Sequence, residues 1–343
     1  MHEVPTIIIG CGPIGLETAV ELKRRGLPYL QFDAGAVGQQ IVDFPSGTRW
    51  FSSPERLSIS GVPFITATNE KGTREEYLAY LRAVVEQFDL EVRTFERVIE
   101  LGHGDGGGFR LRTRTLSGLT HEFACERLVI ASGGTARPRR LGVPGEDLPH
   151  VHRSLGEAHR YLGRRVLVVG GRNSACESAL RAFRCGAEVT ISYRGSELHE
   201  RVKYWIRPEL MAMIASGQVR CLLETEPAAI EPDQVVLRSL KDGSTSTIPV
   251  DDVLLEIGYE ADGSLFEALG ARLEGEDRAV VHDPSTMETT VPGLHVAGTA
   301  VAGTQSRFRV YIENSHIHAK RIAAAFSGEP VPPDPVLPKL PES

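Results

Sequence analysis

The sequence predicts an α/β protein of two Rossmann-type three-layer domains, one inserted into the other. Two observations carry this prediction: a βαβ pattern with a glycine-rich turn opens the chain, and a second pattern of the same kind begins near residue 165. The length of 343 residues agrees with it, because it suffices for two domains that each bury a core.

The first βαβ pattern occupies residues 5–33. Residues 5–9 are rich in β-branched side chains and predict a strand that is buried on both faces. Apolar residues recur at helical spacing over residues 14–25, and Gly26 stands where a helix C-terminal glycine belongs. The next strand, over residues 29–32, ends before Asp33.

The second βαβ pattern repeats this order. A strand over residues 166–169 leads into a glycine pair, a helix runs from about residue 174 to residue 184, and a strand follows over residues 189–193. Between the two patterns, Thr73 and Glu76 form a capping-box signature for a helix that ends near residue 87. Alternating residues at 109–113 predict a further strand, and the strand at 128–130 meets another glycine turn.

The domain borders are predicted from composition. Residues 137–149 are rich in Pro, Arg and Gly and indicate the linker into the inserted domain, with a return near residues 258–264. We therefore expect one domain over residues 1–140 and 263–326 and the inserted domain over residues 141–262. The proline-rich residues 327–343 are expected to form an extended or disordered tail, or a strap on a neighbouring surface, without chemistry of their own.

Composition and charge argue against several classes of protein. The chain is 41% hydrophobic and 24% charged, which is typical of a globular protein. Its net charge of −7 disfavours nucleic acid or an anionic membrane as a partner, and no apolar run approaches the roughly 20 residues that span a bilayer. The five cysteines show no C-x-x-C spacing, so neither a disulfide framework nor a metal site is expected. With no leader pattern at the N-terminus, we expect a cytoplasmic protein whose partner is a small molecule or a small protein.

The first glycine-rich turn has the pattern G-x-G-x-x-G at residues 10–15, after a strand and at the start of a helix. Gly10 permits the tight turn, Gly12 lets the backbone approach a pyrophosphate, and Gly15 packs the helix on the strand. The helix N-terminus then faces the negative charge of the ligand, and Asp33 is placed to accept the ribose hydroxyls. The length and chain position of this pattern favour FAD.

The second turn, GGRNSA at residues 170–175, has Arg172 in place of the second glycine and Ala175 in place of the last. Where a site for NAD would place a carboxylate, the strand ends in Tyr193 and Arg194, so a cation stands where a ribose 2′-phosphate would lie. This favours NADPH over NADH. The alternative for Arg194 is an ordinary solvated side chain at a strand end.

Four further motifs are not general features of Rossmann folds: FSSPERL at residues 51–57, GVPF at 61–64, YRG at 193–195 and YIEN at 311–314. Together with the GGRNSA turn, they resemble the thioredoxin-reductase-like flavoproteins, and most closely the bacillithiol disulfide reductase family. The resemblance extends over nearly the whole chain. It implies a homodimer with an FAD domain at both chain ends, an NADPH domain between them, and hydride transfer from the nicotinamide to the flavin.

The chain also departs from the families that it resembles. GLHVAGT at residues 293–299 looks like their second FAD-binding segment, which normally ends in an aspartate that holds the ribityl chain, whereas this chain has Thr299. Thioredoxin reductases carry a C-x-x-C pair, and the bacillithiol disulfide reductases carry a cysteine at the position of Ile14; this chain has neither. Cys11 lies nearby, and it either stands in as a thiolate at the helix N-terminus or is a small buried side chain.

No catalytic residue is predicted, because the His, Asp and Glu residues show no triad, paired-carboxylate or metal spacing. His316 and His318 are interpreted as packing or flavin-proximal groups, and Arg201 is a reserve candidate for the phosphate contact. The residues expected to bind the two cofactors are Gly10, Gly12, Pro13, Ile14, Gly15, Asp33, Ala34, Gln40, Val98, Ala131, Ser132, Gly133, Gly298, Thr299, Gly170, Gly171, Arg172, Asn173, Ser174, Glu177, Tyr193, Arg194, Lys203 and Gly258.

These observations favour an NADPH-dependent FAD oxidoreductase whose acceptor is a low-molecular-weight disulfide of the bacillithiol disulfide type. A second hypothesis is a ferredoxin or flavodoxin–NADP+ reductase of the thioredoxin-reductase-like type, because those enzymes also lack the dithiol. A third is a redox-sensing flavoprotein that turns over slowly. Flavin monooxygenases are disfavoured, because their His-containing linker fingerprint is not found around residues 137–153.

Overall fold

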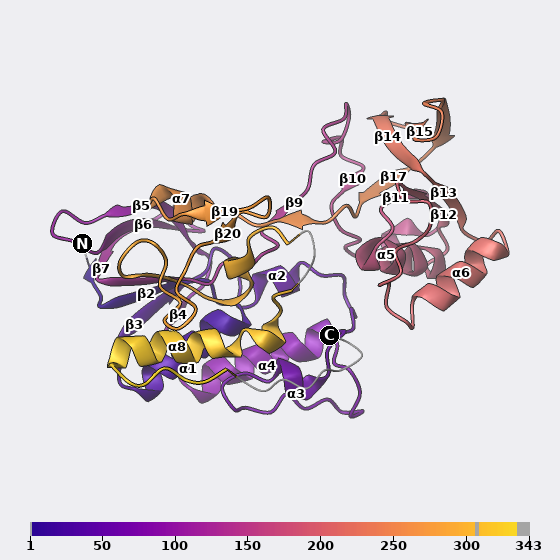
Figure 1. Cartoon of the computed structure of the whole chain (residues 1–343). Helices are drawn as coiled ribbons and strands as arrows, with labels where there is room; N and C mark the ends of the chain where they lie inside the picture. The colour runs from indigo at the N-terminus through magenta and orange to yellow at the C-terminus, as the bar shows by residue number, and fades with distance from the viewer. Residues whose placement is uncertain (1, 306–308, 335–343) are drawn as a thin grey trace. The chain divides into compact units, whose positions relative to one another are not determined.

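The computed structural model describes residues 2–305 and 309–334, and the chain divides into two compact units (Figure 1). The first unit comprises Met1–Val42, Gly47–Arg137 and Tyr259–Ser343, and the second comprises Asp43–Ser46 and Pro138–Gly258. The two main borders therefore lie after Arg137 and after Gly258, where the sequence suggested residues 140 and 262. Of the predicted tail, residues 335–343 lie outside the described residues.

The first unit is built around a five-stranded parallel sheet. Its strands, in order across the sheet, are β21 (Leu294–Val296), β8 (Arg127–Ile130), β2 (Thr6–Ile9), β3 (Tyr29–Phe32) and β4 (Val92–Arg93). Every residue of β2 and β3 is buried, as expected of strands that are covered on both faces.

Two layers cover this sheet (Figure 1). One face carries the helices α1 (Pro13–Arg24), α4 (Arg74–Gln87) and α8 (His316–Ser327). The other face carries the layer β5 (Glu96–His103), β6 (Phe109–Thr115) and β7 (Thr120–Cys125), which is antiparallel, with β1 (His2–Glu3) added parallel to β7. The remaining elements are α2 (Gln39–Val42), α3 (Pro54–Leu57), α7 (Ser264–Ala268), β19 (Leu273–Glu274), β20 (Ala279–Val280), and the 3-10 helices η2 (Gly298–Ala302) and η3 (Ile312–Asn314).

The second unit has its own five-stranded parallel sheet. The strands, in order, are β10 (Val151–His152), β17 (Asp252–Leu255), β11 (Arg165–Val169), β12 (Glu188–Tyr193) and β13 (Arg220–Leu223). The unit also contains the helices η1 (Ala158–Tyr161), α5 (Asn173–Arg184) and α6 (Arg207–Ala215) and the antiparallel strands β14 (Thr225–Ile230), β15 (Gln234–Ser239) and β16 (Thr245–Pro249). The segments that connect the units, β9 (Arg137–Pro138) and β18 (Tyr259–Glu260), pair in a two-stranded sheet.

Strand β11 shows why this unit needs three layers. Successive side chains of a strand point to opposite faces of the sheet. Val166 and Val168 accordingly join the core beneath α5, whereas Leu167 and Val169 join the core beneath β14, β15 and β16. The apolar run in the sequence is therefore buried from both sides, as expected of a strand in a βαβ unit.

The segment after the first border is not a loose linker. Leu141, Val143 and Leu148 pack against the core beneath β14, β15 and β16, and the Ile230 N–H donates to the Pro144 carbonyl at 2.9 Å. Its Pro, Arg and Gly content suggested a linker, and its apolar residues are partly buried against the second unit. This packing explains why the border falls near Arg137.

Most local elements agree with the sequence patterns. The helix predicted at residues 14–25 is α1, the one predicted at about 174–184 is α5, and the strand at 29–32 is β3. The capping box is also present, because Thr73 accepts from the Glu76 N–H and the Glu76 carboxylate accepts from the Thr73 N–H. The described helices include none that is long and apolar enough to cross a lipid bilayer.

The capping box at the start of α4 generates a stability prediction. We expect Thr73→Ala to lower the free energy of unfolding by about 1 kcal/mol, because the N–H groups of the first turn lose their side-chain acceptor. Thr73→Ser keeps that oxygen and should stay within a few tenths of a kcal/mol of the parent. Denaturant unfolding of the three proteins measures this difference, and equal losses in both variants would contradict it.

Candidate functional site

The first glycine turn joins β2 to α1 and depends on the lack of side chains. A Cβ on Gly10, where φ is +114°, would overlap the Ala131 carbonyl at the end of β8, and one on Gly15 would overlap the Gly10 carbonyl. A Cβ on Gly12, by contrast, would meet nothing within 4 Å. The turn is thus tight on its protein side and open at Gly12, at the N-terminus of α1, where the helix dipole favours a phosphate.

Asp33 is held against this turn. Its Oδ2 accepts from the Cys11 N–H at 2.7 Å, and its Oδ1 accepts from the Gly35 N–H at 2.8 Å. Burial raises the pKa of the Asp33 carboxyl, and the two N–H bonds oppose that rise. Each carboxylate oxygen keeps a further lone pair, so Asp33 can still accept ribose hydroxyls as the sequence suggests.

The turn after β8 meets α2. The Gln40 side-chain amide donates to the Ser132 carbonyl at 2.6 Å, and the Thr135 hydroxyl donates to Gln40 Oε1 at 2.7 Å. A Cβ on Gly133 would lie 2.5 Å from the same Oε1. The structure therefore brings together Gln40, Ser132 and Gly133, all expected to bind cofactor, and adds Thr135, whose role no local pattern signals.

The C-terminal segment closes on the same turn. A Cβ on Gly298, where φ is +68°, would lie 3.2 Å from the Cβ of Ile14. The Gly298 N–H donates to His318 Nδ1 at 3.2 Å. Burial lowers the pKa of His318 to about 4, so the ring is neutral and accepts at Nδ1. His318 thus fixes Gly298 beside Ile14, and Thr299 follows half-buried.

Two expected residues lie away from the turn itself. Ala34 is exposed beside Asp33, and Val98 lies in β5, where it pairs with Thr113.

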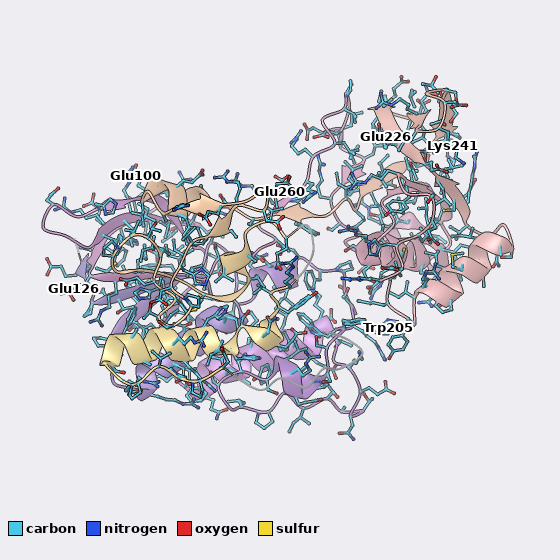
Figure 2. All side chains as sticks on the ribbon, in the orientation of Figure 1. Glu100, Glu126, Trp205, Glu226, Lys241 and Glu260 are labelled. Atoms are coloured by element: carbon cyan, nitrogen blue, oxygen red, sulfur yellow. The ribbon has the colours of Figure 1, made fainter. Side chains whose placement is uncertain are left out.

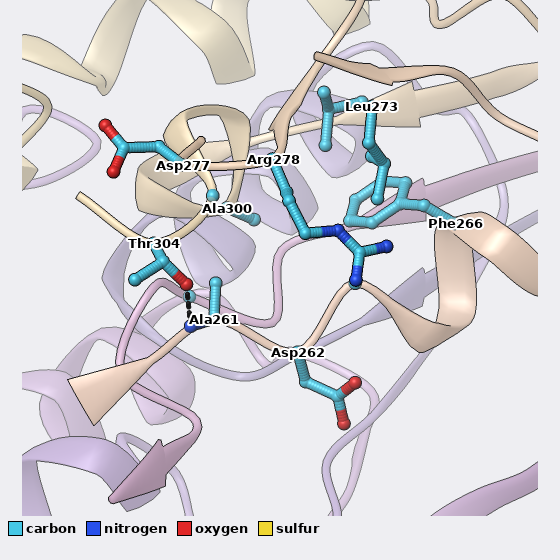
Figure 3. Close-up of a pocket in the computed structure, with 12 residues that line it drawn as sticks. Ala261, Asp262, Phe266, Leu273, Asp277, Arg278, Ala300 and Thr304 are labelled. Atoms are coloured by element: carbon cyan, nitrogen blue, oxygen red, sulfur yellow. Dashed lines mark hydrogen bonds between the residues drawn. The ribbon is translucent and has the colours of Figure 1, made fainter. Parts of the chain in front are cut away.

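Figure 3 shows a further feature of this unit, a cavity of about 30 Å³ lined by Gly133, Phe266 and Thr304 among others. The Ala261 N–H donates to the Thr304 hydroxyl at 2.9 Å at its edge. This cavity has room for about one water molecule.

The second glycine turn joins β11 to α5 by the same principle. A Cβ on Gly170, where φ is +137°, would lie 2.5 Å from the Glu256 carbonyl oxygen and 3.0 Å from the Cβ of Ala175. A Cβ on Gly171 would overlap the ring of Tyr193, and one on Gly195 would lie 2.5 Å from it. The paired glycines therefore make room for Tyr193, and Ala175 fits where the pattern usually has glycine.

The cations around this turn fall into two kinds. Arg172 and Arg194 are exposed, and within residues 2–305 and 309–334 their side chains form no hydrogen bond or ion pair. Lys203 is 8% exposed, its Nζ lies 3.1 Å from Glu177 Oε2, and it lies 5.5 Å from the centroid of the Trp205 ring, which Figure 2 labels. Lys203 thus has a carboxylate partner already, whereas Arg194 is available to a phosphate.

The remaining residues expected at this turn are placed as follows. Asn173 Oδ1 accepts from the Lys203 N–H at 2.7 Å, which ties the start of α5 to the segment after β12. Ser174 is exposed in the first turn of α5. Gly258, where φ is +93°, accepts at its carbonyl from the Arg139 N–H at 3.0 Å, so it belongs to the connection between the units rather than to the glycine turn.

The structure describes all five cysteines, and all are free thiols. Burial raises the pKa of Cys11 well above its usual range, and the charge of Asp33 raises it further. Burial also raises the pKa values of Cys125 and Cys176 to about 12. Because the thiolate is the reactive form, Cys11 is a packed side chain of the turn, which is the second of the two interpretations offered by the sequence.

Comparison with known proteins decides the family. Residues 7–298 match the family described as pyridine nucleotide-disulphide oxidoreductase. The chain belongs to this family. It is 35% identical over 324 residues to bacilliredoxin reductase Bdr of Bacillus subtilis strain 168, an alignment that covers 94% of this chain and 98% of the relative. The solved bacillithiol disulfide reductase Bdr (YpdA) from Bacillus cereus is 33% identical, with a TM-score of 0.90 over 95% of this chain and 99% of that one. A ferredoxin–NADP reductase of Ignicoccus hospitalis is 27% identical over 297 residues, 85% of this chain and 88% of the relative.

Membership of the pyridine nucleotide-disulphide oxidoreductases confirms the predicted fold class, the oxidoreductase activity and the resemblance to bacillithiol disulfide reductases. The family implies a flavin and a nicotinamide nucleotide as ligands. The residues present fit two such groups, because each unit has a glycine turn at a helix N-terminus, and the first turn is open at Gly12.

Thiol burial generates a labelling prediction. In the native protein near pH 8, we expect iodoacetamide to modify Cys185, which is half-buried at the end of α5, long before Cys11, Cys125 or Cys176. Mass spectrometry of peptides over time measures the rates, and the unfolded protein serves as the control in which all five sites react. Labelling of Cys11 as fast as Cys185 would restore it as a reactive thiol.

Proposed function

We propose that this oxidoreductase binds FAD in its first unit and NADPH in its second, and that it reduces a low-molecular-weight disulfide of the bacillithiol disulfide type. One observation carries the proposal: each unit has its own glycine turn, and the groups beside the two turns differ in charge. Asp33 faces the first turn, whereas the exposed Arg172 and Arg194 flank the second.

The first unit supplies a site that suits FAD. Gly12 is the point where a pyrophosphate can approach the backbone, and Asp33 offers acceptors for ribose hydroxyls. Gln40 and Ser132 are tied together at 2.6 Å, and Gly298 lies against Ile14. When bound, FAD supplies the redox chemistry, taking two electrons from the reduced nicotinamide and passing them to a disulfide, which becomes two thiols with protons from solvent.

The second unit favours NADPH over NADH. At the end of β12, where an NAD site has a carboxylate, stand Tyr193 and the exposed Arg194. The ring of Tyr193 is packed over Gly171, so it forms a fixed wall beside the turn in place of the carboxylate. A guanidinium at the next position suits a 2′-phosphate.

The similarity to bacilliredoxin reductase and bacillithiol disulfide reductase supports a disulfide as the acceptor. Because Cys11 is buried, the first turn has no reactive thiol. This observation favours a second candidate for the electron acceptor, namely an iron–sulfur or flavin protein such as ferredoxin or flavodoxin. The relative from Ignicoccus hospitalis is named for that activity. We also propose a homodimer, which the family resemblance implies and which sedimentation of the purified protein tests, and a cytoplasmic location.

Reoxidation of the reduced protein separates the two acceptors. After anaerobic reduction by NADPH, we expect bacillithiol disulfide to reoxidise the bound flavin, and ferredoxin and flavodoxin to do so much more slowly. Stopped-flow absorbance of the flavin measures each rate. The Cys11→Ser variant should behave like the parent, because a buried protonated thiol takes no part. Reoxidation by ferredoxin or flavodoxin alone would overturn the disulfide acceptor and support the second candidate.

Removal of the exposed guanidinium tests the nicotinamide nucleotide. We expect Arg194→Ala to raise KM for NADPH by about 10-fold to 100-fold, since one charge-assisted contact to the 2′-phosphate is lost, and to leave KM for NADH nearly unchanged. Arg184→Ala is the matched control, because Arg184 is also exposed but lies at the far end of α5, paired with Glu209. Equal effects of Arg194→Ala on both nucleotides would reject Arg194 as the selector.

A further inference from the structure

The second unit contains a buried carboxyl at the edge of the sheet where nucleotides bind. In its sheet, the order β10-β17-β11-β12-β13 means that the chain leaves β11 towards β12 on one side, while β17 and β10 lie on the other side. This reversal of direction is a topological switch point, and ligands of such sheets bind outside the carboxyl ends of the strands there. Glu256 is the first residue after β17, and its N–H donates at 3.0 Å to the carbonyl of Val169, the last residue of β11.

Glu256 is part of the packing of the glycine turn. Its carbonyl oxygen occupies the space that a Cβ on Gly170 would need, 2.5 Å away. Its side chain turns under α5, where Oε1 accepts from the Ser178 hydroxyl at 2.8 Å. The residue as a whole is 7% exposed. The carboxyl is therefore enclosed between the turn, α5 and the sheet edge.

Unlike the buried acid Asp252 of the same unit, Glu256 has no cationic partner within the described residues. At the opposite end of the same strand, Asp252 is 1% exposed but is paired with Arg164 and lies 2.9 Å from His152 Nε2. Glu256 forms no ion pair with any residue in the described part of the chain. A buried carboxyl without a cation favours its neutral, protonated form.

The groups that face Glu256 act in both directions on this preference. From α5 they are the Ser178 hydroxyl and the carboxylate of Glu177, which is itself paired with Arg181 and Lys203, and from η1 the titratable group is Tyr161. Burial raises the pKa of Glu256 to about 7 and the charge of Glu177 adds to the rise, while the Ser178 hydroxyl and the Leu155 N–H act against it. Small changes in the charge near the turn therefore decide its protonation near neutral pH.

We propose that Glu256 is a positioning residue for the nicotinamide nucleotide: the nucleotide binds at the second turn with Glu256 as a neutral acid, and ionisation of Glu256 weakens that binding. The inference rests on the proposed function, since it takes the second turn as the nucleotide site. The physical reason is that an ionised carboxylate behind the turn opposes the positive end of the α5 dipole, which attracts the phosphates.

Thermodynamic linkage gives this proposal a signature besides activity. If the protonated form binds better, then binding must favour protonation to the same extent. At a pH above that at which Glu256 ionises, binding of the nucleotide then takes up a proton from solvent onto the Glu256 carboxylate. An acid with a purely structural role in the turn would show no such uptake.

The test is calorimetry of NADP+ binding to the oxidised FAD-bound protein between about pH 6 and about pH 8.5, in buffers of different ionisation enthalpy. We expect Kd of the parent to rise by about fivefold or more over this range, with proton uptake on binding near pH 8. In Glu256→Gln, which keeps the shape and the acceptor for Ser178, this rise and this uptake should disappear. The 2′-phosphate of the nucleotide also titrates, near pH 6, but it does so equally in both proteins and cancels in their difference.

Two further variants sharpen the outcome. Ser178→Ala removes a donor that favours the ionised form, so the rise in Kd should move to higher pH; this variant decides the matter if Glu256→Gln does not fold. Glu188→Gln is the matched control, because Glu188 is an exposed acid at the other end of the sheet, at the start of β12, and it should keep the profile of the parent.

The possible failures are distinguishable. If Glu256→Gln keeps the proton uptake and the pH dependence of the parent, or if Ser178→Ala leaves the profile in place, the role of Glu256 is overturned while NADPH binding stands. If the parent protein binds no NADP+ even near pH 6, the proposed function fails, and the role of Glu256 fails with it.

Discussion

The close approach of two backbones, possible only without a side chain, is the constraint on which both units depend. In the first unit Gly10 lies against the Ala131 carbonyl at the end of β8, and in the second Gly170 lies against the Glu256 carbonyl just after β17. Each contact joins a glycine turn to the neighbouring strand of the same sheet. The same contact also holds the helix N-terminus in the position where a phosphate can bind. The packing that forms each sheet therefore also shapes its expected ligand site.

Around these contacts the two sheets are covered in the same way. Each has helices on one face and an antiparallel layer on the other, and β11 sends alternate residues to the two cores. A strand that is buried on both faces presents no side chains to solvent along its length. Most of the expected cofactor residues lie at the turns at the carboxyl ends of the strands, whereas Val98 lies in β5 and Gly258 in the connection between the units.

The sequence could predict what is encoded locally. The glycine turns, the helix start at Thr73 and the strand at residues 29–32 have signals within a few residues of each other, and the structure has them. Pairings across long distances could not be foreseen. The strands β14, β15 and β16 form a layer of the second unit whose contacts depend on the whole fold, and the bond between Thr135 and Gln40 joins residues that are 95 positions apart. Residues 137–149 have the composition of a linker, but composition alone does not show that Leu141 and Leu148 are partly buried against the core of the second unit.

The charged residues of the site also form contacts that local sequence patterns do not predict. Lys203 and Glu177 were both expected to bind cofactor, and in the structure they bind each other, which no spacing in the sequence indicates. The acids near the two turns differ as well: Asp33 accepts two backbone N–H groups, whereas the position that corresponds to it in the second unit is Tyr193, and the buried acid there is Glu256, on the opposite side of the turn. The two turns thus have nearly the same backbone but different charged groups around them. A backbone cradle recognises only a phosphate, so under the proposed function it is this difference in surrounding charge that would direct two different nucleotides to two similar folds.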